Sequence, residues 1–434
     1  MPLTSPCRAA AVVIAVLAVM ACATAVARAA APAVPAEDAN LARARRVLRS
    51  VPLIDGHNDL PWKIRQSAKS DLDAYDLRTR TPGHTDLERL RAGEVGGQFW
   101  SVYVPGEAKS GWAHTQMEQI ELARRMIERY PDRLELALGA DDVERAFKHG
   151  KVGSLLGMEG GHVIENSLGT LRAYYRLGAR YMTLTHNTTL DWADSAAEPP
   201  RHQGLTRFGE EVVHEMNRLG MLVDLSHVSP DTMEDALRVS EAPCIFSHSS
   251  ARALVDVPRN VPDAILQRVK ETDSIVMVTF VPAFVSAETS KAYKEREAMV
   301  TERTSGITDP AAKEKAQKEL RDANPIPEAT LGQVADHVEY VRKVAGIDHV
   351  GLGGDLDGID KGPQGLEDVS RYPALFAELI KRGWSDEDLK KLAGLNILRV
   401  MRKAEEVARR LQASRPASVA TIEQLDGVAT TPAK

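Results

Sequence analysis

Polar side chains that can bind a metal ion follow most of the short apolar runs in this 434-residue sequence. They occur in the segments DGHND (55–59), EGGH (159–162), SH (226–227) and DLDG (355–358), and as His186 and His248. A single histidine after a strand is more often a hydrogen-bonded core or capping group than a ligand. Imidazoles and carboxylates gathered at one place, however, form the ligand set that suits zinc or a similar divalent ion. The combination predicts a metal site if the fold brings these segments together.

The apolar runs themselves predict a fold that brings these polar segments together. Eight β-rich runs bounded by Gly, Pro or charge span residues 51–55, 98–104, 152–158, 180–185, 221–225, 243–247, 274–280 and 349–353. Segments with helical periodicity, such as 114–130 and 207–219, lie between most of them. Strands covered on both faces lose the apolar/polar alternation, so this pattern favours a closed parallel (β/α)8 TIM barrel. The alternative is an open doubly wound sheet, but IDGHN (54–58) is not a Gly-rich phosphate loop.

In such a barrel the carboxyl ends of the strands meet at one mouth, where the candidate ligands are predicted to face a common space. His57 and Asp59 lie two residues apart in a short extended segment, in which alternate side chains point the same way. That spacing favours joint ligation of one ion. Serines flank His248, but the chain has no Gly-x-Ser-x-Gly elbow, which argues against a serine hydrolase.

Several long runs make the sequence resemble the membrane (renal) dipeptidase family of zinc peptidases, peptidase family M19. They are LIDGHNDLPW (53–62), GMEGGH (157–162), LTHN (184–187), FSHSSA (246–251) and RNVPD (259–263). The resemblance extends from about residue 48 to residue 407, and the motifs occur in the family's order. It implies an amidohydrolase-type barrel that hydrolyses the peptide bond of dipeptides with a hydroxide held between two Zn²⁺ ions.

The resemblance also implies a role for each matching metal ligand. His57 and Asp59 match the ligands of one zinc ion, and His227 and His248 match the ligands of the other. Glu159 matches the carboxylate that bridges both ions. Such ions lower the pKa of bound water from about 15.7 toward roughly 7, which supplies a nucleophile at neutral pH.

Three further residues match positions that handle the substrate. His186 matches the histidine that contacts the substrate and stabilises the tetrahedral intermediate, and Asp355 matches the acid that moves the proton. Arg259 matches the arginine that helps to bind the substrate carboxylate, a role that suits its fork of donors. The competing interpretation for Arg259 is a surface ion pair with Asp256 or Asp263.

Two residues near the motifs are predicted to support the site rather than to bind metal, and some positions depart from the family pattern. We interpret His162 as a group that hydrogen-bonds near the ligands and Asp357 as part of a loop. Phe284 stands where the mammalian enzymes carry a tyrosine, so one hydroxyl for substrate recognition is missing. The charged segment 286–325 is an insertion, predicted to be a solvated helical pair or, alternatively, a lid over the site.

Two other functions remain open on sequence grounds. One is another binuclear amidohydrolase reaction, such as hydrolysis of an acylated amino acid, a lactam or a lactone. The other is a metal-stabilised protein that binds peptides without cleaving them. Arg259 argues for a substrate with a carboxylate, and a binding protein would need neither Asp355 nor His186. The resemblance further implies tolerance of a D-residue at the second position and cleavage of some β-lactams.

Composition and the ends of the chain limit partners and location. The 55 Lys plus Arg and 61 Asp plus Glu leave a net charge of -6, which argues against a nucleic-acid partner. Residues 1–29, with Arg8 before an apolar run and ARA at 27–29, resemble a cleaved secretory signal. We therefore expect an exported protein, periplasmic or secreted, with a lead-in at 30–47, the barrel at 48–411 and a frayed polar tail at 412–434.

Alternatives to simple cleavage are an uncleaved anchor and a lipoprotein acylated at Cys22, which would attach the protein to a membrane. Cleavage after residue 29 would leave Cys244 as the one cysteine of the mature chain, and hence no internal disulfide. The family often dimerises, so the resemblance leaves a homodimer open.

Overall fold

The computed structural model describes residues 38–107 and 110–427, and it contains a (β/α)8 barrel. Nine parallel strands lie within the described residues. They are β1 (Leu53–Asn58), β2 (Val95–Ser101), β3 (Leu134–Leu136), β4 (Val152–Glu159), β5 (Ala179–Thr183), β6 (Leu222–Asp224), β7 (Ile245–Phe246), β8 (Ile275–Val278) and β9 (Val350–Leu352). The order β2-β1-β9-β8-β7-β6-β5-β4 closes on itself because β4 also pairs with β2.

The predicted barrel is therefore confirmed, and each of the eight predicted strands overlaps one strand of the ring. The exception is β3, which the sequence did not predict. It is three residues long and pairs only with the start of β4, through Leu134 opposite Val152. A strand this short leaves no periodic signal in the sequence.

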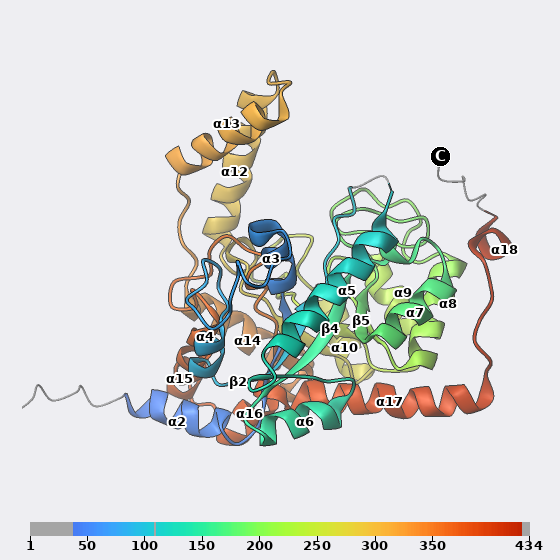
Figure 1. Cartoon of the computed structure of the whole chain (residues 1–434), viewed down its shortest axis with the longest axis horizontal. Coiled ribbons are helices and arrows are strands. Elements are labelled where there is room, and N and C mark those ends of the chain that lie inside the picture. Colours follow the sequence, from blue (N-terminus) through green and yellow to red (C-terminus); the bar gives the residue numbers. More distant parts are fainter. Residues whose placement is uncertain (1–37, 108–109, 428–434) are drawn as a thin grey trace, which may run out of the picture. The chain divides into compact units, whose positions relative to one another are not determined.

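Helices connect the strands, and most of them cover the outside of the barrel (Figure 1). They are α2 (Ala39–Leu48), α3 (Leu60–Ala68), α4 (Leu87–Ala92), α5 (Trp112–Arg129), α6 (Ala140–Lys148), α7 (Leu168–Leu177), α8 (Arg207–Leu219), α9 (Pro230–Val239), α10 (Asp263–Glu271), α11 (Pro282–Val285), α12 (Ala287–Thr304), α13 (Pro310–Ala323), α14 (Leu331–Ala345), α15 (Tyr372–Lys381), α16 (Asp386–Lys390), α17 (Asn396–Ser414) and α18 (Ile422–Asp426). Local signals set their ends: Thr206 caps the N-terminus of α8, and Gly220 ends it in the left-handed conformation.

The half of the barrel interior away from the mouth, here called the floor, is filled with apolar side chains. They come from most strands of the ring and from helix α17, which packs beneath them: Ile54, Phe99, Leu155, Leu222, Ile245, Ile275, Met277, Ile397 and Met401. The strands β1, β2 and β4 are buried along their whole length. Burial on both faces explains why they appear in the sequence as continuous apolar runs.

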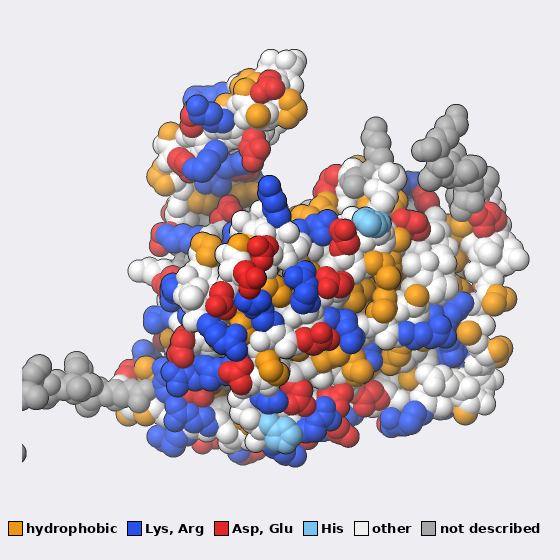
Figure 2. Space-filling model, viewed as in Figure 1, with side chains coloured by type: hydrophobic (Ala, Val, Ile, Leu, Met, Phe, Trp, Pro, Cys, Tyr) orange, Lys and Arg blue, Asp and Glu red, His pale blue; other side chains and the backbone are white. Residues whose placement is uncertain are grey.

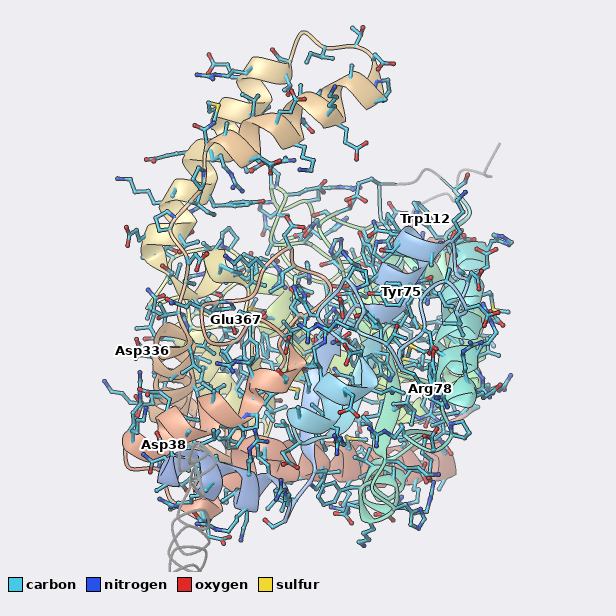
Figure 3. All side chains as sticks on the ribbon, turned by 60° about the vertical axis from the view of Figure 1, so that its left-hand side comes forward. Asp38, Tyr75, Arg78, Trp112, Asp336 and Glu367 are labelled. Carbon is cyan, nitrogen blue, oxygen red and sulfur yellow. The ribbon has the colours of Figure 1, made fainter. Side chains whose placement is uncertain are left out.

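The insertion after β8 consists of helices α12 and α13, which are joined by the Arg321–Glu297 ion pair at 2.7 Å. Helix α13 buries none of its residues, and α12 buries few. Side chains of both helices project into solvent (Figure 3), and acidic, basic and hydrophobic groups are mixed on their visible face (Figure 2). The exposure of both helices fits the predicted solvated helical pair, and the alternative role as a lid stays a prediction.

The C-terminal boundaries differ from those predicted. Helix α17 ends at Ser414 rather than at residue 411, the predicted end of the barrel. The predicted fraying is wrong for residues 415–427, because α18 packs against α8: Ile422 is buried, and Thr206 Oγ1 donates to Asp426 at 2.6 Å. A capping box of Thr421 and Gln424 stabilises this short helix.

Residues from Asn40 onward form one unit. None of the helices in the described part of the chain is long and apolar enough to cross a bilayer. The predicted signal segment 1–29 lies outside the described residues, and so does most of the lead-in.

Candidate metal centre

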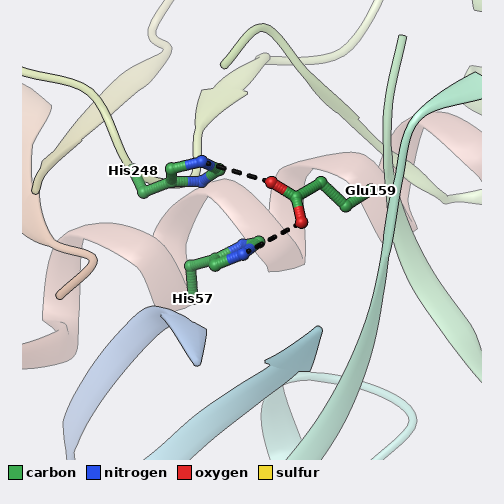
Figure 4. A group of neighbouring side chains, drawn as sticks. All are labelled: His57, Glu159 and His248. Atoms are coloured by element: carbon green, nitrogen blue, oxygen red, sulfur yellow. Dashed lines mark ion pairs between the residues drawn. The ribbon is translucent and has the colours of Figure 1, made fainter. Parts of the chain in front are cut away.

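Glu159, the last residue of β4, lies at the centre of the cluster formed at the mouth (Figure 4). Its two carboxylate oxygens face different groups. Oε2 lies 3.4 Å from His57 Nε2, whereas Oε1 lies 3.0 Å from His227 Nε2 and 3.5 Å from His248 Nε2. Asp59 completes the first side, with Oδ2 3.2 Å from His57 Nε2. The five predicted ligands thus meet as two groups that share one carboxylate.

Each of the three histidines has its second ring nitrogen, Nδ1, engaged by an oxygen from a neighbouring element. His57 Nδ1 lies 2.7 Å from the Tyr181 hydroxyl, and His227 Nδ1 lies 3.1 Å from Asn187 Oδ1. The third contact joins His248 Nδ1 to Ser247 Oγ at 2.8 Å. A ligating histidine is commonly oriented in this way, with Nδ1–H donated to an oxygen and Nε2 left for the metal.

The free ring nitrogens fit divalent ions. With Nδ1 protonated, the Nε2 atoms of His227 and His248 are both acceptors, yet they face each other at 3.0 Å. His57 Nε2 is buried and has no hydrogen-bond partner. The facing lone pairs of His227 and His248 are costly unless a cation lies between them. At His57 the neighbouring carboxylates of Glu159 and Asp59 raise the pKa of the imidazole well above its usual value, so this position too attracts positive charge, as a proton or as a metal ion. Burial lowers the pKa of both His227 and His248, so each is neutral and able to ligate.

A distortion of β1 brings His57 to this position. Asp55 pairs with Gln98 and Asn58 with Trp100, so β1 has one residue more than β2 over this stretch. Such bulges redirect a side chain and recur beside active sites.

Asp55 is a buried residue that links the distorted end of β1 to the residues that follow β9. Its Oδ1 accepts the backbone N–H of His57 at 2.8 Å and that of Gly354 at 3.0 Å. In return, the N–H of Asp355 donates to the carbonyl of His57 at 3.1 Å. Burial raises the pKa of Asp55 to about 6. Asp55 therefore sets the separation of His57 and Asp355, although the sequence analysis gave it no role.

Asp355 lies close enough to His57 and Asp59 for one atom of each to lie within 4.8 Å of the others. Its backbone is in the left-handed region, at φ 58°, a conformation that non-glycine residues adopt rarely and that can be part of a functional site. Burial raises the pKa of Asp355 well above its usual value, and the carboxylates of Asp59 and Glu159 add to this effect. A carboxyl group with a raised pKa can both accept and donate a proton near neutral pH.

His186 follows β5 and lies against the side of the cluster where His227 and His248 meet. Its Nε2 is 4.0 Å from Glu159 Oε1, and its ring centroid is 4.4 Å from that of His227. Tyr103 packs edge-on against it at 4.9 Å, and Trp62 packs against Tyr103 at 5.2 Å. Burial lowers the pKa of His186, so the ring is neutral and presents one N–H donor.

Arg259 is buried at the rim of the same cluster, with only 8% of its surface exposed. Its guanidinium lies 5.5 Å from the centre of the Phe284 ring and makes long contacts, each 3.4 Å, with Ser249 Oγ and the His248 carbonyl. Burial lowers its pKa to about 10, which leaves it charged at neutral pH. Within the described chain it has no acidic partner within 4.0 Å, so the competing interpretation as a surface ion pair does not describe it.

His162 and Asp357 lie outside the ligand groups. His162 Nε2 is 3.0 Å from the carbonyl of Val104, and burial lowers its pKa to about 4. Asp357 accepts the N–H of His84 at 2.7 Å, and its own N–H donates to His84 Nδ1 at 2.9 Å. Both residues hold mouth loops in place.

The model of one protein family, described as membrane dipeptidase (peptidase family M19), matches residues 41–415. The chain belongs to the membrane dipeptidase family. As predicted, it is a metallopeptidase of the dipeptidase type, and the ligand clusters lie at the mouth of this family's barrel.

The chain is also similar to a curated dipeptidase and to solved structures that share its fold. Dipeptidase verJ of Clonostachys rogersoniana is 42% identical over 385 residues, which cover 86% of this chain and 89% of the relative. The crystal structure of the probable dipeptidase PvdM from Pseudomonas aeruginosa has a TM-score of 0.74 at 25% identity, covering 85% of this chain and 99% of that one. A metallopeptidase from Rhodobacter sphaeroides, liganded with a phosphinate mimic of the dipeptide L-Ala-D-Ala, has a TM-score of 0.67 at 24% identity, with coverages of 82% and 99%.

The oxygens that orient the three histidines were not predicted from the sequence. Tyr181 and Asp224 belong to predicted strands, where we expected only barrel packing. Asn187 and Ser247 were quoted as parts of motifs but had no assigned function. One signal was present for Asp224, since an acid inside an otherwise apolar strand must be compensated by buried donors.

Proposed function

We propose that this membrane dipeptidase family member hydrolyses dipeptides at two zinc ions bridged by Glu159. The observation that carries the proposal is that the two oxygens of this carboxylate face different residues. One oxygen faces His57, and the other faces His227 and His248. Nitrogen and carboxylate ligands of this kind suit zinc. When bound, the ions supply Lewis-acid chemistry: they polarise the scissile carbonyl and acidify water.

The chain's own residues bind and orient the substrate. The buried Arg259 is charged and has no acidic partner in the described chain, so it is available to the free C-terminal carboxylate of a dipeptide. This interaction favours substrates whose carboxylate lies one residue from the scissile bond. Tyr103 and Trp62 form an apolar wall beside His186, against which a side chain of the substrate can pack.

Two residues handle charge and protons during bond cleavage. His186 donates an N–H to the carbonyl oxygen as negative charge develops there. Asp355, with its raised pKa, takes a proton from the attacking water and delivers it to the leaving amine. Both residues follow strands of the barrel and are partly exposed at its mouth, where a substrate can reach them.

The stereochemistry of the second residue is part of the proposal. The Rhodobacter structure with the L-Ala-D-Ala mimic motivates testing L-D dipeptides beside L-L dipeptides. Acceptance of both would fit a site that recognises the C-terminal carboxylate through Arg259 and leaves the second side chain near the open rim.

The test uses purified protein from residue 30 onward and a panel of L-L and L-D dipeptides, with matched C-terminal amides and tripeptides. Amino-acid release is measured before chelation, after chelation and after zinc is restored. Zinc-dependent cleavage confined to dipeptides with a free carboxylate supports the proposal. Absence of cleavage by fully zinc-loaded protein overturns it and favours another amidohydrolase substrate or a peptide-binding role.

We also propose that the protein is exported through its N-terminal segment. The support is the sequence pattern of residues 1–29, with its apolar run and small residues before residue 30. N-terminal sequencing of the protein recovered from the cell envelope and medium tests this. A mature N-terminus at residue 30 supports simple cleavage, an acylated Cys22 supports a lipoprotein, and an intact Met1 contradicts export by cleavage.

A further inference from the structure

A buried acid that belongs to neither ligand group lies behind His248. Asp224, the last residue of β6, is completely buried. Its Oδ1 accepts the backbone N–H groups of Ser226 at 3.1 Å and Ser247 at 2.8 Å. Its Oδ2 accepts the hydroxyls of Thr183 at 2.5 Å and Ser247 at 2.6 Å. All four contacts are therefore made with groups that can donate.

These contacts determine the direction of each proton. Backbone N–H groups can only donate, so they hold Oδ1 in place and prevent the carboxylate from turning over. The two hydroxyl contacts have the lengths of O–H groups donated to a charged oxygen. Ser247 therefore gives its single hydroxyl proton to Asp224.

The same serine touches His248 on its other side. Because the Ser247 proton is already used, the 2.8 Å contact between Oγ and His248 Nδ1 must be a hydrogen bond donated by Nδ1–H. His248 is then neutral and protonated at Nδ1. Its Nε2 carries the lone pair that faces Glu159 Oε1 and His227.

We propose that Asp224 is a positioning residue, which acts through Ser247 to fix His248 in the tautomer that binds metal. The inference rests on the proposed metal site, and Asp224 itself touches neither the ligand atoms of that site nor the substrate. His57 and His227 are oriented differently, by the hydroxyl of Tyr181 and the amide oxygen of Asn187. Loss of Asp224 therefore affects the position formed by His227 and His248 more than the one formed by His57 and Asp59.

The isosteric variant Asp224→Asn makes a specific prediction. The two backbone N–H groups keep the side-chain oxygen at Oδ1, so the new NH₂ group replaces Oδ2 and donates to Ser247. Ser247 then donates its own proton to His248 Nδ1, and the imidazole proton moves to Nε2, where it faces the metal position. Ser247→Ala removes the hydroxyl that connects Asp224 to His248, a connection here called the relay. It breaks the relay without reversing the direction of its hydrogen bonds. Thr183→Val is the matched control, because it removes the other hydroxyl on Oδ2 and leaves the relay intact.

The experiment uses the protein from residue 30 onward. It is prepared without metal and then titrated with zinc in competition with a chromophoric chelator. Imidazole tautomers are read in the metal-free protein by ¹⁵N-histidine NMR. We expect a His248 Nδ1–H in the wild type and in Thr183→Val, and an Nε2–H in Asp224→Asn. We also expect one of the two zinc affinities to fall about 10- to 100-fold in Asp224→Asn and in Ser247→Ala, and to change less than about threefold in Thr183→Val.

Several results would overturn the inference. Wild-type zinc affinities in Asp224→Asn, an unchanged tautomer, or an equal loss in Thr183→Val would show that Asp224 is only a packing residue. If Asp224→Asn does not fold, as judged by circular dichroism, Ser247→Ala decides, and wild-type affinities in that variant contradict the relay. Failure of the proposed function would be a separate outcome. Wild-type protein would then bind no zinc or cleave no dipeptide, and the tautomer of His248 could still be measured in the metal-free protein.

Discussion

The mouth and the floor of the barrel are built by the same strands and are both largely buried, yet they contain opposite kinds of side chain. The floor contains apolar groups such as Phe99, Ile275 and Met277. The mouth contains Glu159, three ring nitrogens around it and the guanidinium of Arg259. Buried apolar groups stabilise the fold, whereas buried polar groups cost stability unless they are paired. Burial alone therefore does not distinguish structure from function; the kind of buried atom does.

The backbone shows the same contrast. His227, Asp355 and Asp357 at the mouth have left-handed φ values of 70°, 58° and 66°, and none of the floor residues named above does. Each such residue costs roughly 1–3 kcal/mol and persists because its surroundings hold it. The contrast predicts that variants at the mouth change activity and variants at the floor change stability.

The largest expected effect is at the shared carboxylate. Glu159→Gln removes one ligand from both groups, and we expect kcat/KM for a dipeptide to fall about 1000-fold or more, with loss of metal. Steady-state kinetics and metal analysis measure both quantities. Glu128→Gln, an exposed change on α5, is the matched control. Wild-type metal content in Glu159→Gln would contradict a bridging role.

The next effect concerns the proton. Asp355→Asn is expected to lower kcat about 100-fold or more while metal content stays at the wild-type level, because an amide cannot move a proton. Retained turnover would contradict the role of Asp355. Loss of metal would instead make Asp355 a ligand beside His57 and Asp59.

A floor variant should show the opposite pattern. Ile275→Ala deletes buried methyl groups, and we expect the free energy of unfolding to fall by about 2–5 kcal/mol while kcat/KM below the melting range changes little. Chemical denaturation measures the first quantity, and Ile275→Val serves as a control with a loss of about 0.5–1.5 kcal/mol. A large loss of activity with unchanged stability would remove the contrast between mouth and floor.

Arg259→Lys tests recognition of the substrate carboxylate, since it retains the charge and removes the fork of donors. We expect kcat/KM for dipeptides to fall about 30-fold, equivalent to about 2 kcal/mol, with little change for the slow cleavage of matched C-terminal amides. Kinetics on both substrates decide the outcome. Equal losses on the acid and the amide would mean that Arg259 does not contact the carboxylate.

The smallest effect is a pH dependence of stability from a buried histidine behind the mouth. Burial lowers the pKa of His337 from 6.5 to about 4, and its Nδ1 accepts the N–H of Ala251 at 3.1 Å. The unfolded chain binds a proton at higher pH than the folded chain does. The stability contributed is therefore present above pH 6.5 and is lost as the pH falls toward 4, by about 2 kcal/mol between pH 7 and pH 5.

The measurement is denaturation of the metal-free protein at several pH values. His337→Asn is the comparison, because its amide oxygen can replace Nδ1 as the acceptor and does not titrate. A smaller pH dependence in the variant is expected, and identical curves for the two proteins would show that His337 does not carry this effect.

The architecture was predictable from the sequence because burial on both faces turns barrel strands into continuous apolar runs. The positions of the candidate ligands were predictable for a related reason, since strand ends in a barrel share one mouth. The three-residue strand β3 and the docking of α18 were not predictable, because both depend on contacts with distant elements.

The supporting groups of the site were harder to find. Tyr181 reaches His57 across the barrel, above Gly157, where a Cβ atom would lie only 2.0 Å from the tyrosine ring. Asp224 approaches His248 through Ser247, which directly follows the neighbouring strand β7. Contacts between strands this far apart in the sequence leave no local pattern, so they could be identified only from the structure.

The most direct test of the two-metal site is the crystal structure of the zinc-loaded enzyme with anomalous scattering measured at the zinc absorption edge. We predict two anomalous peaks that share Glu159, one beside His57 and Asp59 and the other beside His227 and His248. A single peak, or peaks that leave Glu159 uncoordinated, would contradict this prediction.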